Sequence, residues 1–184
     1  MLGSRRIPMA THAPAHPRTT ATRVSLVVGA VLTAIAGALI LARRPHEAAA
    51  CAGVSAVLLL IGGHRSNHGA GDPLDRMLDA LLDRLWDGVV LASIAWTARG
   101  PSPHIAAAAL AALGASFLSS YIRARGASLG YTVEESHVTR GLRYALIVAG
   151  LAFGWLGWTV WTVFGISVLA VVVRTSQVAK EEWA

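Results

Sequence analysis

The amino-acid sequence predicts an all-α integral membrane protein with six transmembrane helices. Of its 184 residues, 54% are hydrophobic and only 14% are charged, and the mean hydropathy is +0.54. Apolar runs of about 20 residues, the length that crosses a bilayer as a helix, recur along the chain. This composition leaves too little polar surface to cover a soluble domain, so we expect most of the chain to lie in lipid.

The N-terminal segment differs in composition from the rest of the chain. Residues 1–22 are rich in Ala, Thr, Pro and His and contain no acidic residue, which predicts a disordered cytosolic tail. The apolar run 24–42 that follows is too long for the hydrophobic region of a signal peptide. We therefore expect a tail over 1–22, a membrane domain over 23–174 and a second cytosolic tail over 175–184.

The predicted spans follow one another along the membrane domain. The first four are expected at 24–42, 47–63, 74–98 and 104–121, the last of these continuing through Arg125. The apolar stretch 141–173 is too long for one crossing. Gly154 and Gly157 interrupt it, so we divide it into a fifth and a sixth span. The single cysteine, Cys51, cannot form an intrachain disulfide.

The distribution of basic residues predicts the orientation in the membrane, because cytosolic loops carry an excess of Lys and Arg. With the N-terminus in the cytosol, the outside loops hold Arg43, Arg44 and Arg99. The inside segments hold a much larger set: Arg5, Arg6, Arg18, Arg23, Arg65, Arg76, Arg123, Arg125, Arg140, Arg143, Arg174 and Lys180. We therefore expect a multi-pass plasma-membrane protein with both termini in the cytosol. This topology explains the net charge of +6, and we expect no nucleic-acid partner.

An acidic stripe, formed by Asp75, Asp79, Asp83 and Asp87, runs along the third predicted span. A helix turns by about 100° per residue, so side chains four residues apart share one face. An aspartate at the centre of a membrane helix costs about 2.5 to 3.5 kcal/mol, so the stripe is expected to face water, a cation or a partner. Oxygen-rich clusters suit hard cations such as Mg²⁺, Mn²⁺ or Ca²⁺.

Three short motifs resemble one enzyme family. The run LDALLDR at 78–84, followed by Asp87 and Gly88, resembles the second half of the CDP-alcohol phosphatidyltransferase signature, D-x2-D-G-x2-A-R-x8-G-x3-D-x3-D. The run SYIRAR at 120–125, with Gly130 shortly after, resembles the end of that family's fourth helix. The run TRGLR at 139–143 resembles the entry to its fifth. The match covers the six spans in order, and the branch it most resembles is that of the actinobacterial phosphatidylinositol phosphate synthases.

The resemblance implies an activity and a set of site residues. The family transfers a phosphatidyl group from CDP-diacylglycerol to an alcohol, using two divalent cations and a carboxylate that deprotonates the attacking hydroxyl. By motif position Asp79 is then a ligand of Mg²⁺ or Mn²⁺, and Asp83 is the general base. The family also has D-R-x-x-D-G at this place, which implies that Asp87 forms a structural pair with Arg84. The implied substrate-binding residues at the cytosolic mouth are Gly62, Arg123, Arg125, Arg140 and Arg143. These arginines equally suit stop-transfer charges that contact anionic lipids.

The first half of the signature is absent. Counted back from Asp79 without gaps, its two leading aspartates fall on Leu58 and Ile61, and no acid lies between Glu47 and Asp72. The acid of the family's fifth helix is replaced by Leu142. The charge complement that makes a two-metal site strong is therefore incomplete.

Nearby residues offer a substitute metal site. His64 and His68 are four residues apart, Asp72 lies close in sequence, and Asp75 is an additional candidate metal ligand. The alternative is that both histidines lie in a wet interfacial loop, because the glycines around them favour a flexible segment.

Three hypotheses about function are weighed against the sequence. The first is a transferase of phospholipid biosynthesis that takes CDP-diacylglycerol and forms a homodimer. The second is a catalytically lapsed subunit that binds lipid or pairs with an active paralogue as a heterodimer. A third, a small ion or solute carrier that uses the acidic stripe, lacks the inverted repeat expected of such folds. The sequence does not reveal the acceptor alcohol.

Overall fold

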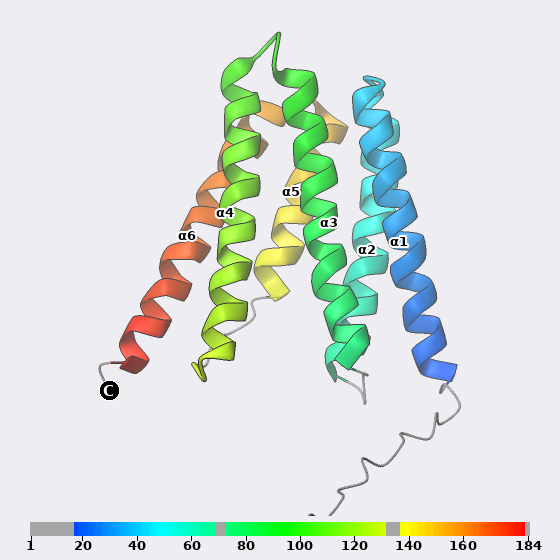
Figure 1. The fold of residues 1–184 in the computed structure, drawn as a ribbon. Coiled ribbons are helices and arrows are strands. Elements are labelled where there is room, and N and C mark those ends of the chain that lie inside the picture. Colours follow the sequence, from blue (N-terminus) through cyan, green and yellow to red (C-terminus); the bar gives the residue numbers. More distant parts are fainter. Residues whose placement is uncertain (1–16, 69–72, 132–136, 183–184) are drawn as a thin grey trace, which may run out of the picture.

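The computed structural model describes residues 17–68, 73–131 and 137–182, and these residues form six helices. The helices are α1 (Pro17–Leu41), α2 (Pro45–His68), α3 (Pro73–Ala98), α4 (Pro103–Ser128), α5 (His137–Phe153) and α6 (Leu156–Glu182). Consecutive helices run in opposite directions, so the described chain begins and ends at the same end of the bundle (Figure 1). The predicted all-α class is confirmed for this part of the chain.

The two ends of the described chain are more helical than expected. α1 begins at Pro17, whose fixed φ and missing N–H suit the first turn of a helix, so residues 17–22 are helical rather than disordered. Disorder of residues 1–16, which lie outside the described chain, stays a prediction. α6 continues to Glu182, which makes most of the expected C-terminal tail helical as well.

The C-terminal part of α2 corrects the expectation of a flexible loop. The helix runs through Gly62 and Gly63 to His68. A Cβ at residue 62 would lie 2.8 Å from Leu26 Cδ2 of α1, and a Cβ at residue 63 would lie 2.6 Å from Asp79 Oδ1 of α3. The missing side chains therefore permit close packing, which offsets the roughly 0.5 to 1 kcal/mol that a glycine costs inside a helix.

The predicted division of the last apolar stretch is confirmed. α5 ends at Phe153 and α6 begins at Leu156, and Gly154 between them has a φ of +73°. A positive φ is unfavourable for residues with a Cβ, so glycine permits the reversal here. Close to this turn, a Cβ on Gly150 would lie 2.4 Å from Thr159 Oγ1, which shows how closely α5 and α6 pack.

The helices of the described chain form a closed ring. α1 packs on α2 and α3, α4 packs on α3 and α6, and α5 packs on α2 and α6. α3 and α5 meet in the interior through their side chains: Trp86 of α3 and Tyr144 of α5 are both buried, and their ring centroids are 4.1 Å apart. The ring thus brings the face of α3 that carries the acidic stripe toward α5.

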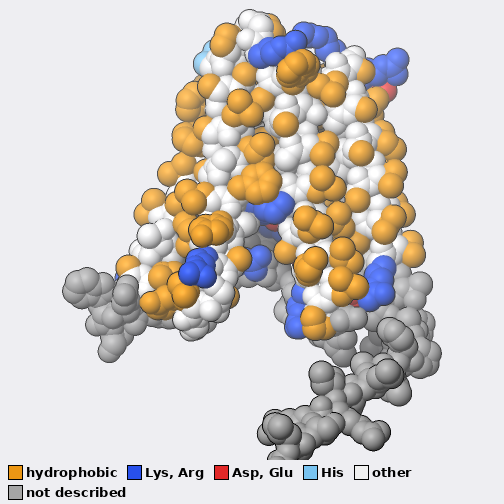
Figure 2. Space-filling model, viewed as in Figure 1, with side chains coloured by type: hydrophobic (Ala, Val, Ile, Leu, Met, Phe, Trp, Pro, Cys, Tyr) orange, Lys and Arg blue, Asp and Glu red, His pale blue; other side chains and the backbone are white. Residues whose placement is uncertain are grey.

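Four helices of the described chain, α1, α2, α4 and α6, are long and apolar enough to cross a membrane. α3 carries the acidic stripe. α5 has 17 residues, which span about 25 Å of a hydrocarbon core roughly 30 Å thick. Hydrophobic side chains cover the flank of the bundle (Figure 2), and exposed Val31, Leu110 and Leu169 are examples. This apolar flank supports a membrane protein.

Candidate functional site

The acidic stripe lies inside the bundle. Its members, Asp75, Asp79, Asp83 and Asp87, have exposed fractions of 1%, 4%, 7% and 1%. The expectation that these side chains avoid lipid is confirmed, and their partners are arginines. A buried carboxylate needs such a partner, because removing an unpaired charge from water costs several kcal/mol.

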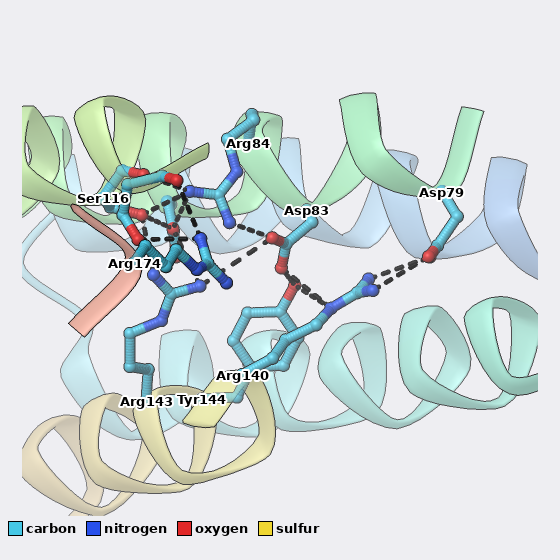
Figure 3. Close-up of polar contacts among 10 residues, drawn as sticks. Asp79, Asp83, Arg84, Ser116, Arg140, Arg143, Tyr144 and Arg174 are labelled. Atoms are coloured by element: carbon cyan, nitrogen blue, oxygen red, sulfur yellow. Dashed lines mark hydrogen bonds and ion pairs between the residues drawn. The ribbon is translucent and has the colours of Figure 1, made fainter. Parts of the chain in front are cut away.

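Arg140 of α5 contacts two members of the stripe (Figure 3). Its Nη1 and Nη2 donate to Asp79 Oδ2 and Oδ1 at 3.0 Å each, and its Nε lies 2.8 Å from Asp83 Oδ1. Tyr144, one turn further along α5, donates its hydroxyl to Asp83 Oδ1 at 2.6 Å. The paired N–H groups of a guanidinium match the two oxygens of a carboxylate, so Arg140 fixes the orientation of Asp79.

Ser116 of α4 connects the other end of the network. Its hydroxyl donates to Asp87 Oδ2 at 2.5 Å and accepts from Arg84 Nη1 at 2.5 Å and from Arg143 Nη1 at 2.7 Å. Arg143 Nη2 lies 3.2 Å from Asp87 Oδ2, and Arg84 Nη1 lies 3.4 Å from the same oxygen. The predicted pair between Asp87 and Arg84 is therefore confirmed. Arg84 also pairs with Asp83.

Asp75 pairs with the first helix. Arg23 Nε of α1 donates to Asp75 Oδ1 at 2.8 Å, and Arg23 is partly exposed while Asp75 is buried. Each member of the acidic stripe thus has at least one arginine partner. The arginines come from α1, α3 and α5, so the network links three segments that are far apart in sequence.

A pocket lies beside the network, between α3, α4, α5 and α6. Five arginines and one aspartate line it, together with small and hydroxyl-bearing side chains: Asp83, Arg84, Ser116, Ser119, Ser120, Arg123, Thr139, Arg140, Arg143, Ala170 and Arg174. Figure 2 shows basic side chains inside a hollow of the bundle. The excess of guanidinium groups over carboxylates suits an anion, and phosphate oxygens match the fork of an arginine.

The pocket includes some of the predicted substrate-binding residues and not others. Arg123, Arg140 and Arg143 line it. Arg125 is exposed and is not part of the lining, and Gly62 packs against α1 instead. The substrate-binding roles themselves stay predictions.

Sequence reasoning missed two arginines of the pocket. Arg84 was assigned only as a partner of Asp87, although it follows the second motif aspartate directly. Arg174 of α6 donates through Nη1 to the Ser119 carbonyl at 2.9 Å and to Ser119 Oγ at 2.7 Å. Arg174 is a lone basic residue directly after the apolar stretch 141–173. The predicted topology puts it on the same side of the membrane as Arg123, and this was the available signal that the two lie near each other.

The ungapped alignment assigns the missing ligands to Leu58, which lies toward α1, and to Ile61, which is 41% exposed. Gly63 is the α2 residue against Asp79, and Leu60 precedes it by three residues and shares its face. Gly63 is therefore the α2 position that meets the acidic stripe, and residue 60 is a candidate second position on the same face.

The donor set does not fit the two divalent cations that the family resemblance implies. Among the residues that the structure describes, no three His, Cys, Asp or Glu side chains are placed to hold a metal ion. Both oxygens of Asp79 accept from Arg140, and α2 presents Gly63 to Asp79 rather than an acid. Asp75, the second predicted ligand, is bonded to Arg23.

The substitute ligands predicted from the sequence are only partly described. His64 lies on α2 and is exposed. The side chain of His68 and all of Asp72 lie outside the described residues. The roles of Asp79 and Asp75 as metal ligands and of Asp83 as general base stay predictions.

Comparison with known proteins gives three related sequences, although no protein family profile matches the chain. The chain is 30% identical over 138 residues to a phosphatidylinositol phosphate synthase of Corynebacterium glutamicum, a match that covers 73% of this chain and 63% of the relative. It is 33% identical over 94 residues to the Mycolicibacterium smegmatis synthase of the same name, covering 50% and 42%. It is 36% identical over 95 residues to an archaetidylinositol phosphate synthase of Methanothermobacter thermautotrophicus, covering 52% and 47%. The matched part of the chain thus spans less than two thirds of each relative.

Solved structures show the same fold. The Mycobacterium tuberculosis phosphatidylinositol phosphate synthase with CDP-DAG bound superposes with a TM-score of 0.73 at 21% identity, covering 89% of this chain and 94% of that chain. The same enzyme in complex with manganese and citrate gives a TM-score of 0.69 at 20% identity, covering 88% and 81%. The described part of this chain therefore shares its fold with these proteins.

Proposed function

We propose that this chain, whose homologues are phosphatidylinositol phosphate synthases of the CDP-alcohol phosphatidyltransferase family, is a membrane protein of phospholipid biosynthesis that binds CDP-diacylglycerol. In the family reaction the phosphatidyl group passes from this lipid to an alcohol. We propose that this chain retains the binding step and that its transfer activity is reduced or lost. The observation that carries the proposal is the pocket in which arginines outnumber carboxylates.

The chemistry of the pocket supports binding of a phosphate-bearing lipid. The pyrophosphate of CDP-diacylglycerol is a compact anion, and guanidinium groups can donate paired hydrogen bonds to its oxygens. Arg123 and Arg174 also line the pocket, and we propose that their guanidinium groups contact the phosphates. The hydroxyls of Ser119 and Ser120 can add further donors.

The state of Asp83 argues for slow transfer. As general base, its carboxylate has to accept a proton from the attacking alcohol. Its Oδ1 already accepts from Tyr144 and contacts Arg140, while its Oδ2 pairs with Arg84 and lies 3.8 Å from Arg143. Both oxygens are therefore engaged before any substrate enters. A general base held in this way is poorly placed to take a proton.

A partner subunit of an active paralogue is the second candidate function. The same neutralised acidic stripe favours it, because such a subunit can contribute a lipid-binding surface without performing chemistry. A heterodimer with an intact synthase and a homodimer of this chain are the two assemblies to be distinguished. The acceptor alcohol, where transfer occurs, is not defined by the residues of the pocket.

Substitution of Arg123, which lines the pocket, tests lipid binding. Arg123→Gln should weaken binding of CDP-diacylglycerol about tenfold or more, since a hydrogen bond to a charged group contributes about 1.5 to 3 kcal/mol. Binding would be measured in detergent with EDTA present, by the rise in melting temperature with lipid concentration. Arg125→Gln is the matched control, because Arg125 is exposed two residues away and outside the pocket, and it should bind like the unmodified chain. Equal losses in both variants would mean that the lipid binds only to a charged surface.

We also propose that all six helices cross the plasma membrane, with both termini in the cytosol. The apolar flank of the bundle, the common end at which α1 begins and α6 ends, and the bias of basic residues support this topology. α3 can cross because its aspartates are paired inside the ring.

Cysteine labelling tests the orientation. In a Cys51→Ser background, single cysteines placed near Arg43 or Arg99 should react with a membrane-impermeant maleimide added to intact cells. Cysteines near His68 or Glu134 should react only after the cells are opened. Labelling at His68 in intact cells would contradict the topology.

A further inference from the structure

Arg140 lies between the carboxylates of Asp79 and Asp83, the two aspartates that match the second half of the family signature. Three of its nitrogens are used: Nη1 and Nη2 bind Asp79, and Nε contacts Asp83. Arg140 is 7% exposed, so this guanidinium is a buried and permanent positive charge. It contacts both the candidate metal ligand, Asp79, and the candidate general base, Asp83.

The charge of the whole network is balanced without any ion. The four aspartates of the acidic stripe pair with an equal number of arginines, Arg23, Arg84, Arg140 and Arg143. A divalent cation placed between Asp79 and Asp83 would lie beside these fixed positive charges. Repulsion between like charges is strong where water is excluded, so such a cation would be disfavoured as long as Arg140 stays in place.

α2 contributes no charge on the opposite side. Gly63 lies so close to Asp79 that an added Cβ would be 2.6 Å from Asp79 Oδ1, and Leu60 is the neighbouring position on that face. A two-metal site needs several carboxylates that converge from more than one helix. Here the space that an opposing carboxylate would fill is closed by the backbone of α2. The counter-charge of Asp79 therefore comes from α5.

We propose that Arg140 replaces the divalent cation in this chain. The negative charges of Asp79 and Asp83 are then balanced without metal. The proposal goes beyond lipid binding, because it concerns the resting state of the site whether or not a lipid is bound or turned over. It predicts that the unmodified protein does not bind Mn²⁺ or Mg²⁺ at this site. It also predicts that a variant without the Arg140 guanidinium binds them.

The test uses Mn²⁺ alone, with no lipid. The melting temperature of the full chain in detergent should be the same in EDTA and in Mn²⁺, and the electron paramagnetic resonance signal of free Mn²⁺ should not decrease on addition of protein. Arg140→Gln should melt at a lower temperature, because Asp79 loses its partner. Mn²⁺ at about ten times its dissociation constant should then raise that temperature by roughly 3 to 6 °C and lose free signal.

Two further variants separate charge from structure. Arg140→Lys keeps the positive charge and should stay insensitive to Mn²⁺. Arg44→Gln removes an arginine from an exposed pair with Glu47 and should change neither the melting temperature nor the metal response. If Arg140→Gln does not fold, Arg140→Gln with Asp79→Asn removes both partners, should fold, and should bind no Mn²⁺.

Two results would overturn the proposal. One is Mn²⁺ binding by the unmodified chain that disappears in Asp79→Asn, which would show that a cation and Arg140 share the site. The other is a folded Arg140→Gln protein that binds no more Mn²⁺ than the unmodified chain. Neither readout depends on CDP-diacylglycerol, so failure here and failure of the proposed lipid binding can be told apart.

Discussion

Purified and supplied with CDP-diacylglycerol, Mn²⁺ or Mg²⁺ and an acceptor, the chain should release CMP at least about 10²-fold more slowly than an intact phosphatidylinositol phosphate synthase. Removal of one preorganised electrostatic stabiliser from an active site costs about 10² to 10³ in rate, and here the opposing ligands are absent. General base catalysis by Asp83 contributes only about 10² to 10⁴ and cannot replace that stabilisation. The acceptor panel would contain inositol phosphate, glycerol phosphate, inositol and serine.

Two pairs of acid substitutions sharpen this experiment. Leu58→Asp with Ile61→Asp follows the ungapped alignment, whereas Leu60→Asp with Gly63→Asp follows the face of α2 that meets Asp79. Only the second pair, combined with Arg140→Gln, should yield Mn²⁺-dependent CMP release above the blank, because Ile61 is exposed on the flank of the bundle and Arg140 disfavours a cation beside Asp79. Fast release by the unmodified chain that is lost in Asp83→Asn would contradict the proposal of a reduced activity. Release that appears only when an intact synthase is added would identify the chain as a partner subunit.

Arg143→Gln should lower the free energy of unfolding by about 3 to 5 kcal/mol. The substitution leaves Asp87, which is 1% exposed, with Arg84 at 3.4 Å as its remaining arginine partner. It also removes one of the two charged donors to the Ser116 hydroxyl, which Arg143 Nη1 bonds at 2.7 Å. The measurement is a denaturant titration in detergent micelles, followed by the fluorescence of Trp86 and the other tryptophans.

A double variant is the control for this second prediction. Arg143→Met with Asp87→Leu removes both charges and should recover most of the lost stability, because replacing a buried ion pair by apolar groups of similar volume is often close to neutral. Arg44→Gln, in an exposed pair with Glu47, should change stability by less than about 1 kcal/mol. A loss for the double variant as large as for Arg143→Gln would mean that packing rather than charge decides the effect.

The sequence predicted the helices well because hydropathy is a local property. The third span was expected at 74–98 and is α3 (Pro73–Ala98), and the break at Gly154 follows from the length of the apolar stretch and the conformational freedom of glycine. α2 was placed too short because Gly62 and Gly63 favour a loop in isolation. Their close contacts with Leu26 and Asp79 are tertiary, and no local pattern contains them.

The site was harder to predict than the fold. Asp79, Asp83 and Arg140 were all identified as functional candidates from motif position. The assignment of their partners depends on how the ring closes, since Arg140 and Asp79 are 61 residues apart in sequence. Composition and spacing indicated that the acidic stripe needs a counter-charge but could not decide between a metal ion and a guanidinium. In the closed ring, α5 supplies the counter-charge of Asp79 through Arg140, whereas α2 contributes only Gly63 there.

The contact between Gly63 and Asp79 bears on how such a site changes over evolutionary time. An acid introduced at residue 63 would meet the Asp79 carboxylate at once, and that carboxylate is held in place by Arg140. We expect an acid at residue 63 alone to lower stability before it adds a metal ligand. We expect a metal-dependent version of this site to require changes at residues 60, 63 and 140 together, so no single substitution on this path would be favourable by itself.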